Sequence, residues 1–300
     1  MLRIAWAPGY AHVLPADHRF PMAKYDLLPE QIIRQGIALE KAFFVPDGLA
    51  ESPLLAVHTL EYWHRLHTGL LTPAEMRKTG FPWSSALVER EVVIAEGTRR
   101  CCEYALEHGA AANIAGGTHH AYADHGEGFC LLNDQAIAAR WLLDTGRARQ
   151  VLIVDLDVHQ GNGTAAIFAA EPRVFTFSMH GAANYPARKE HSDLDIPLPD
   201  GIKDEDYLAQ LRATLPRLLA EVRPDIVFYL AGVDVLATDK LGRLALSPAG
   251  CLERDRFVFR ICQRAGLPVV TCMGGGYSPR LADIVDAHTN TFRAMQETWD

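Results

Sequence analysis

The chain has 300 residues, of which 49% are hydrophobic and 22% charged, a balance typical of a globular protein. Its net charge of -8 and the lack of a long run of Lys and Arg argue against a nucleic-acid-binding protein. No apolar run approaches the roughly 18 residues of a membrane span, and the sequence starts without an apolar signal segment. We therefore expect a cytoplasmic protein with neither a nucleic acid nor a membrane as partner.

Short apolar runs alternate with longer amphipathic stretches along the chain. The apolar runs predict strands at 3–6, 112–115, 151–156, 174–178, 225–231 and 269–273. The stretches between them predict helices at 29–44, 85–108, 133–145, 203–221, 247–265 and 279–296. This alternation is typical of a mostly parallel sheet with helices on both faces, and no linker divides the chain. The pattern predicts one α/β domain over residues 1–300.

The segment VDLDVHQGNG, residues 154–163, combines the end of an apolar run with three ionisable side chains at alternate positions. Asp155, Asp157 and His159 would point to the same side if the strand continued, because side chains alternate across a strand. Two carboxylates and an imidazole that converge need a cation or a shared proton, since unpaired buried polar groups cost several kcal/mol.

Three other predicted strands also end in polar residues next to glycine. They are followed by GGTHH at 116–120, by AGVD at 231–234 and by MGGGY at 273–277. Active sites of such sheets lie beyond the carboxyl ends of the strands, so we expect these segments to meet. Asp157, His159 and Asp234 would then form a set of two oxygen ligands and one nitrogen ligand with open positions, as in catalytic zinc sites. Fe²⁺, Co²⁺ or Mn²⁺ could occupy the same ligands.

Two histidines suit proton transfer near that site, and two further residues suit orienting them. His119 and His120 are candidates because imidazole titrates near neutral pH. Asp155 and Asn162 are candidate partners that orient the two imidazoles.

Taken in order, the segments GGTHHA, GFCLLND, DLDVHQGNG, AGVD and GGGY resemble the zinc-dependent histone deacetylase family. The resemblance extends from APGYAHVLPADHRFPMAKY to GGGYSP and is strongest to the class IV branch and its bacterial relatives. It implies a single three-layer α/β/α domain of the arginase/deacetylase type, with a central, mainly parallel, eight-stranded sheet.

The resemblance also implies roles for individual residues. It places the metal ligands at Asp157, His159 and Asp234 and the tandem catalytic histidines at His119 and His120. Tyr277 matches the tyrosine that donates a hydrogen bond to the substrate carbonyl, and Asp155 matches the carboxylate behind the first histidine. Asn162 stands where some relatives have Asp, which should make His120 easier to deprotonate.

Substrate and potassium contacts follow from the same resemblance. Phe129 matches one aromatic wall of an acyl-lysine tunnel, Tyr185 is a candidate for the opposite wall, and Gly128 and Gly275 are further substrate-binding positions. Family members also bind K⁺ through backbone carbonyls, at positions that correspond to Asp155, Asp157, His159, Ser178 and Met179. The acidic rim residue of class I members has no clear equivalent in TGFPWSSALVER, which puts a preference for peptides in doubt.

The predicted function is a Zn²⁺-dependent amide hydrolase that removes an acetyl or longer acyl group from lysine in a protein or peptide. An acetylpolyamine or other acylated small amine is an alternative substrate. A ureohydrolase of the same fold would need an Asp two residues beyond His159, where this chain has Gly161. A non-catalytic acyl-lysine binding protein would have no use for a proton shuttle.

Overall fold

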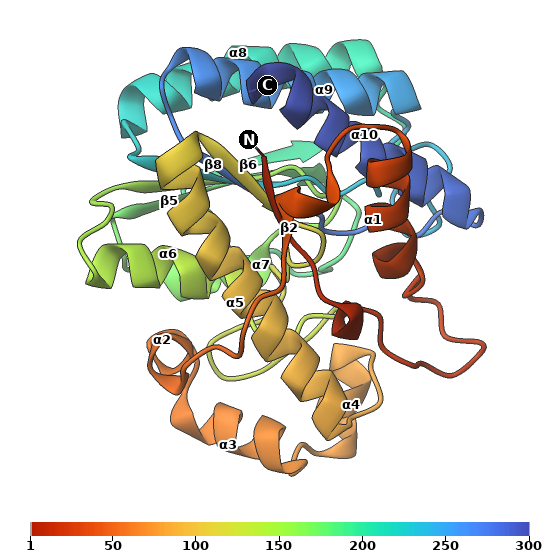
Figure 1. Ribbon diagram of the computed structural model, residues 1–300, viewed down its shortest axis with the longest axis vertical. Helices are drawn as coiled ribbons and strands as arrows, with labels where there is room; N and C mark the ends of the chain where they lie inside the picture. Colours follow the sequence, from red (N-terminus) through yellow and green to blue (C-terminus); the bar gives the residue numbers. More distant parts are fainter. Residues whose placement is uncertain (1, 300) are drawn as a thin grey trace.

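An eight-stranded parallel sheet forms the centre of the computed structural model, which describes residues 2–299 (Figure 1). Its strand order is β2-β1-β3-β8-β7-β4-β5-β6, and every neighbouring pair is parallel. The strands are β1 (Arg3–Ala5), β2 (Phe43–Phe44), β3 (Ala110–Asn113), β4 (Val151–Asp155), β5 (Val174–Gly181), β6 (Leu194–Leu198), β7 (Ile226–Leu230) and β8 (Val269–Cys272). The expectation of an eight-stranded, mainly parallel sheet is confirmed.

Helices cover both faces of the sheet. Figure 1 shows α8 and α9 across one face, and α5, α6 and α7 on the other. The helices are α1 (Lys24–Arg34), α2 (Glu51–Leu55), α3 (Leu60–Thr68), α4 (Pro73–Thr79), α5 (Ser85–His108), α6 (Asp134–Asp144), α7 (Asn162–Phe168), α8 (Asp204–Val222), α9 (Pro248–Arg264) and α10 (Leu281–Trp299), with 3₁₀ turns η1 (Pro8–Tyr10) and η2 (Glu40–Ala42). Within residues 2–299, none of these helices combines the length and the apolar character needed to cross a membrane.

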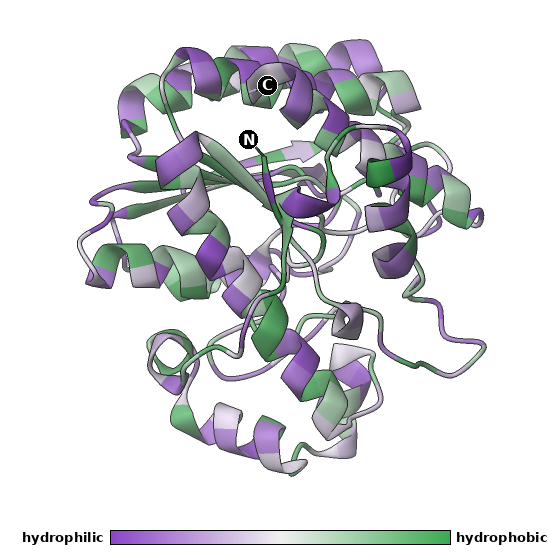
Figure 2. Cartoon of the chain, in the orientation of Figure 1, coloured by the Kyte–Doolittle hydropathy of each residue, from purple (hydrophilic) through white to green (hydrophobic). Residues whose placement is uncertain are grey.

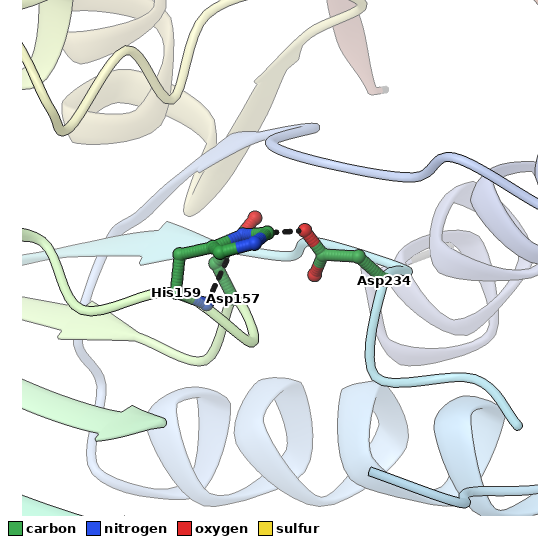
Figure 3. A group of neighbouring side chains, drawn as sticks. All are labelled: Asp157, His159 and Asp234. Atoms are coloured by element: carbon green, nitrogen blue, oxygen red, sulfur yellow. Dashed lines mark hydrogen bonds and ion pairs between the residues drawn. The ribbon is translucent and has the colours of Figure 1, made fainter. Parts of the chain in front are cut away.

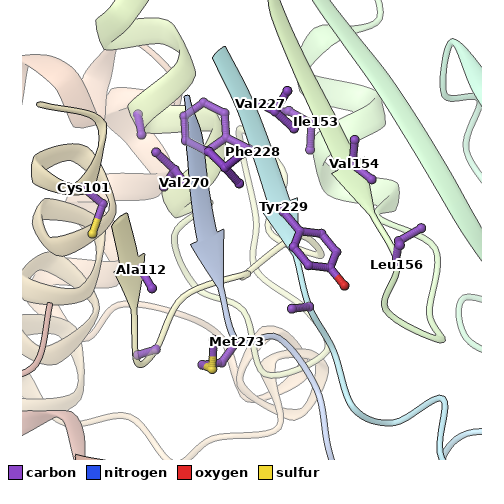
Figure 4. Packing of buried hydrophobic residues seen from close by; sticks show 14 of the residues in the cluster. Cys101, Ala112, Ile153, Val154, Leu156, Val227, Phe228, Tyr229, Val270 and Met273 are labelled. Atoms are coloured by element: carbon purple, nitrogen blue, oxygen red, sulfur yellow. The ribbon is translucent and has the colours of Figure 1, made fainter. Parts of the chain in front are cut away.

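The four central strands are buried on both faces. Every residue of β3, β4, β7 and β8 is buried, and Figure 4 shows Phe228 of β7 next to Val270 of the neighbouring strand β8, with which it pairs in register. Continuous apolar strands of this kind need helices on both sides, and burying each large side chain contributes about 1.5–3 kcal/mol. Hydrophobic and hydrophilic residues alternate along α5, α8 and α9 in Figure 2, as expected for helices with one face on the sheet.

The structure corrects several predicted elements. The helix expected at 29–44 is wrong, because α1 begins at Lys24 and ends at Arg34, and Gly36 then adopts a left-handed conformation with φ 68°. The same stretch goes on to form the edge strand β2. The other edge strand, β6, was not predicted either, since it is half exposed and contains Pro197.

The order of the strands explains where a site can form. Strands β3, β8, β7 and β4 are neighbours in the sheet and run in the same direction, so their carboxyl ends lie side by side. The polar segments GGTHH, MGGGY, AGVD and DLDVH all follow these ends, as the sequence predicts.

Candidate active site

Asp157, His159 and Asp234 converge beyond the ends of β4 and β7 (Figure 3). His159 Nδ1 lies 3.0 Å from Asp157 Oδ1 and 3.2 Å from Asp234 Oδ2. All three side chains are buried, and one ligand atom from each lies within 4.8 Å of the others. The structure therefore brings together the three residues that the sequence predicts as metal ligands.

The carboxylates of this cluster are held in place by backbone N–H groups. Gly275 N donates to Asp157 Oδ2 at 2.8 Å, and Val158 N donates to Asp234 Oδ1 at 3.0 Å. Asp234 Oδ2 is buried and accepts no hydrogen bond from the described residues, because its 3.2 Å contact with His159 Nδ1 lacks hydrogen-bond geometry. An unsatisfied buried carboxylate oxygen beside a second carboxylate and an imidazole fits a divalent cation, because such burial is otherwise costly.

The tandem histidines have different partners, although they are adjacent in the chain. His119 Nδ1 lies 2.6 Å from Asp155 Oδ2, whereas His120 Nδ1 lies 2.6 Å from the amide oxygen of Asn162. Burial alone lowers the pKa of His119, but the charge and hydrogen bond of Asp155 outweigh it, so this pKa is raised. The pKa of His120 is lowered well below its usual value by burial and by the neighbouring imidazoles. The pair thus combines a more basic and a less basic imidazole.

A carboxylate that the sequence analysis missed lies behind Asn162. Asn162 Nδ2 donates to Glu127 Oε1 at 2.6 Å and to the hydroxyl of Tyr122 at 3.0 Å. The amide is thereby fixed with its oxygen toward His120, which identifies Nδ1 as the protonated ring nitrogen of the neutral imidazole. Glu127 precedes the motif GFCLLND by a single residue, and no periodic pattern marks it.

The predicted tunnel residues line a cavity that leads to the cluster. Phe129, Tyr185, His120, His159 and Tyr277 all border a cavity of about 610 Å³. A second, smaller cavity of about 40 Å³ is bordered by Tyr277, by both tandem histidines and by Asp157. The two predicted walls therefore do border one opening. The His120 ring packs edge-on against Tyr185, with centroids 5.0 Å apart.

Glycines let the backbone pass close to this site. A Cβ atom at Gly128 would lie 2.6 Å from the His120 ring, and its φ of 57° is itself unfavourable for other residues. A Cβ atom at Gly275 would collide with the Asp234 carboxylate. Gly275 therefore supports the ligand cluster through its N–H group, and its role as a substrate-binding residue stays a prediction.

The candidate potassium positions lie on β4, on the loop that follows it and on the neighbouring strand β5. Asp155 pairs in register with Ser178, which Met179 follows. Asp157 and His159 continue from the end of the same strand, β4. A potassium ion held by these carbonyls stays a prediction.

Two fully buried cations next to the cluster were missing from the sequence analysis. Lys24 is fully buried, and its Nζ donates to the carbonyl of Gly274 at 3.1 Å. Arg254 on α9 is also fully buried and donates to the carbonyls of Leu156 and Gly232 at 3.2 and 2.7 Å. Both side chains hold the backbone next to the ligand cluster. Lone basic residues inside helices carry no sequence signal for such a position.

Comparison with known proteins gives a consistent family match. Residues 18–292 match the family model of a histone deacetylase domain. An uncharacterized protein from Picosynechococcus sp. is 44% identical over 296 residues, which cover 99% of each chain. Histone deacetylase 2 of Arabidopsis thaliana is 30% identical over 278 residues, covering 89% of this chain and 72% of that protein.

Solved structures show the same fold. An HDAC homolog from Aquifex aeolicus has a TM-score of 0.83 at 23% identity, covering 99% of this chain and 84% of that chain. An HDAC homolog complexed with SAHA has a TM-score of 0.85 at 24% identity, with the same coverage of the two chains.

Proposed function

The chain belongs to the histone deacetylase family, and on this premise we propose that it is a metal-dependent amide hydrolase that removes an acyl group from lysine. The observation that carries the proposal is the convergence of the Asp157–His159–Asp234 cluster, the tandem histidines and Tyr277 around two cavities that share lining residues. A hydrolase needs these groups together, because the scissile carbonyl must meet an electrophile, a base and a hydrogen-bond donor at once.

Asp157, His159 and Asp234 are the residues that would hold the metal, with Zn²⁺ as the preferred ion and Fe²⁺ or Co²⁺ as alternatives. When bound, such an ion supplies Lewis acidity, which polarises an amide carbonyl and lowers the pKa of water to about 7.

The tandem histidines divide the movement of protons between them. His120, whose pKa is lowered, is neutral near pH 7 and can accept a proton from the attacking water. His119, whose pKa is raised next to Asp155, can hold a proton for the leaving amine. The two ring centroids are only 4.1 Å apart, so both imidazoles can reach the same reacting group.

Tyr277 and the aromatic walls complete the proposed site. The phenol can donate a hydrogen bond to the carbonyl oxygen, and this bond strengthens as negative charge develops there. Phe129 and Tyr185 would enclose the aliphatic chain of the acyl-lysine and exclude water from the amide.

The alternatives differ in what they require of the chain. A ureohydrolase would need a carboxylate at position 161, but a Cβ atom at Gly161 would collide with the Asp155 carboxylate. A non-catalytic binding protein would not need two histidines with opposite pKa shifts. An acylated small amine fits the same chemistry and must be separated from acyl-lysine by experiment.

The test is a turnover assay with zinc-reconstituted protein on acetyl-lysine peptides, longer acyl-lysine peptides and acetylpolyamines. Acyl release from the lysine peptides, lost in Asp234→Asn, is the expected result. If only acetylpolyamines are turned over, the substrate is an acylated polyamine and not acyl-lysine. If metal-loaded protein turns over no amide at all, the proposed chemistry is contradicted.

A further inference from the structure

Four basic side chains surround the outer cavity. Arg19, Arg77, Lys78 and Arg243, here termed the basic rim, line the same 610 Å³ cavity as His120, His159 and Tyr277. All four rim residues are exposed, although the chain as a whole has a net charge of -8. The opening to the candidate active site is therefore lined by positive charge, whereas the net charge of the molecule is negative.

One half of the basic rim is built around Phe129. The last turn of α4 is tied to the tunnel wall, because Gly128 N donates to Lys78 O at 3.0 Å and Phe129 N donates to Thr79 O at 2.7 Å. These bonds hold Arg77 and Lys78 at the opening. Arg19 lies over the Phe129 ring, with its guanidinium carbon 4.9 Å from the centroid.

The other half is built next to Tyr185. Asn184 Nδ2 donates to Leu241 O at 2.7 Å, and Arg243 N donates to Asn184 Oδ1 at 3.2 Å. The loop that carries Arg243 is thus fixed to the loop that carries the second tunnel wall. These hydrogen bonds hold the rim cations next to Phe129 on one side of the opening and next to Tyr185 on the other.

The charges of the basic rim are only partly neutralised. Lys78 Nζ lies 3.6 Å from Glu127 Oε2, and Arg243 lies 3.2 Å from Asp200 Oδ2. Within residues 2–299, neither Arg19 nor Arg77 has a carboxylate oxygen within 4.0 Å. Two guanidinium groups are therefore available to a ligand, and like charges around a concave opening reinforce their common field.

We infer that the basic rim selects acyl-lysines that carry carboxylates close to the acylated side chain, and disfavours acylated polyamines. The inference rests on the proposed amide hydrolase function and names its substrate class. A lysine flanked by Asp or Glu would place its carboxylates near Arg19 and Arg77 while its acyl group enters between Phe129 and Tyr185. A polyamine would instead bring cations to the same place.

The expected selectivity is moderate. One exposed ion pair typically changes affinity by a factor of about 1.4 to 5, so exchanging two flanking lysines for glutamates should raise kcat/KM roughly tenfold at low ionic strength. At about 1 M salt, where the Debye length is about 3 Å, the two peptides should approach equal kcat/KM.

The experiment compares capped acetyl-lysine peptides with Glu, Gln or Lys at both flanking positions, together with acetylputrescine. Free Nε-acetyl-lysine and its methylamide separate an α-carboxylate from acidic side chains as the recognised group. Binding of the same peptides to the Tyr277→Phe protein, measured by fluorescence anisotropy at two salt concentrations, gives a readout that does not depend on turnover.

Charge reversal at the rim supplies the matched control. Arg77→Glu should abolish most of the Glu-over-Lys preference, whereas Arg212→Glu, the same charge change on an exposed position of α8, should retain it. Turnover of the Gln-flanked peptide tests the proposed function separately. Equal binding and turnover for Glu and Lys flanks at low salt would overturn the basic-rim inference even if that peptide is deacylated.

Discussion

At the scale of single residues, the proposed chemistry depends on two neighbouring histidines that have unlike partners. Asp155 gives His119 a charged acceptor, whereas Asn162 gives His120 a neutral one. The difference matters because only a neutral imidazole can accept a proton near pH 7, and only a protonated one can return it.

The first prediction concerns the pH dependence that Asn162 imposes. A carboxylate at this position should raise the pKa of His120, because negative charge favours the imidazolium form. The acidic limb of the pH profile of kcat/KM should therefore move to higher pH, since His120 must lose its proton before it can act as a base. The variant to measure is the double substitution Asn162→Asp with Glu127→Gln. Glu127 must be changed as well, because Asn162 Nδ2 lies only 2.6 Å from Glu127 Oε1, and two carboxylates at that distance would share a proton.

Glu127→Gln alone is the control for that experiment. It removes a negative charge near His120, so its acidic limb should stay in place or move to lower pH. An unmoved limb in the double variant would show that His120 is not the titrating base.

The second prediction concerns Tyr277. The ring centroids of Tyr277 and Phe129 are 5.9 Å apart, and Tyr277→Phe keeps this contact between the rings. Thermal stability and zinc content should therefore hardly change. Loss of one hydrogen-bond donor to a developing oxyanion typically lowers kcat about 10²–10³-fold, or roughly 2.7–4 kcal/mol. The loss of turnover, measured by rapid-quench kinetics, should therefore be much larger than the loss of affinity, measured by peptide binding. Equal losses in both would identify Tyr277 as a substrate-gripping residue instead.

The sequence predicts the ligands and the histidines because they stand directly after apolar strands, where the topology of a parallel sheet brings them together. Glu127 and Lys24 could not be predicted in this way. Their roles arise from contacts with Asn162 and Gly274, at positions 35 and 250 residues away in the chain.

At the scale of secondary-structure elements, α9 holds the two strand ends that carry the ligand cluster. Arg254 donates to the carbonyl of Leu156, just before Asp157, and to that of Gly232, two residues before Asp234. It also pairs with Asp255, and both side chains are fully buried. A helix on one face of the sheet thus fixes the spacing between loops from β4 and β7.

The third prediction tests this connection. Arg254→Met should lower the free energy of unfolding by about 3–5 kcal/mol, because removing one partner leaves a buried carboxylate without its counter-charge. Zinc affinity should fall as well, since the two ligand loops lose their common anchor. Urea unfolding and elemental analysis measure the two effects. Arg256→Met, two positions further along α9 but partly exposed and paired with Glu297, should cost less than about 1 kcal/mol and should retain zinc.

The helices and strands that were predicted correctly have a strong apolar pattern, such as β4, which is completely buried, and the long helix α5, which buries one face. The stretch predicted as a helix at 29–44 has apolar residues at helical spacing, yet it turns at Gly36 and then adds β2 to the sheet edge. Local spacing cannot reveal this, because a two-residue edge strand gains its hydrogen bonds only from β1.

At the scale of the whole molecule, the candidate site joins segments from across the chain. The basic rim takes residues from positions 19, 77, 78 and 243, whereas the ligand cluster comes from positions 157, 159 and 234. Net charge sums over the entire chain, so a composition of -8 conceals a local excess of positive charge at the opening. Only the folded structure shows that positive charge gathers at the opening while the chain as a whole is negative.

The proposed amide hydrolysis requires a metal held by the Asp157–His159–Asp234 cluster. The most direct measurement is acetyl-lysine peptide turnover by chelator-treated protein that is titrated with zinc, alongside metal content from elemental analysis. Activity should be absent after chelation and should rise linearly until one zinc per chain is bound. Asp157→Ala, His159→Ala and Asp234→Ala should bind no zinc at this site and stay inactive while remaining folded. Full turnover by metal-free protein, or full zinc occupancy and activity in these variants, would contradict a catalytic metal at this cluster.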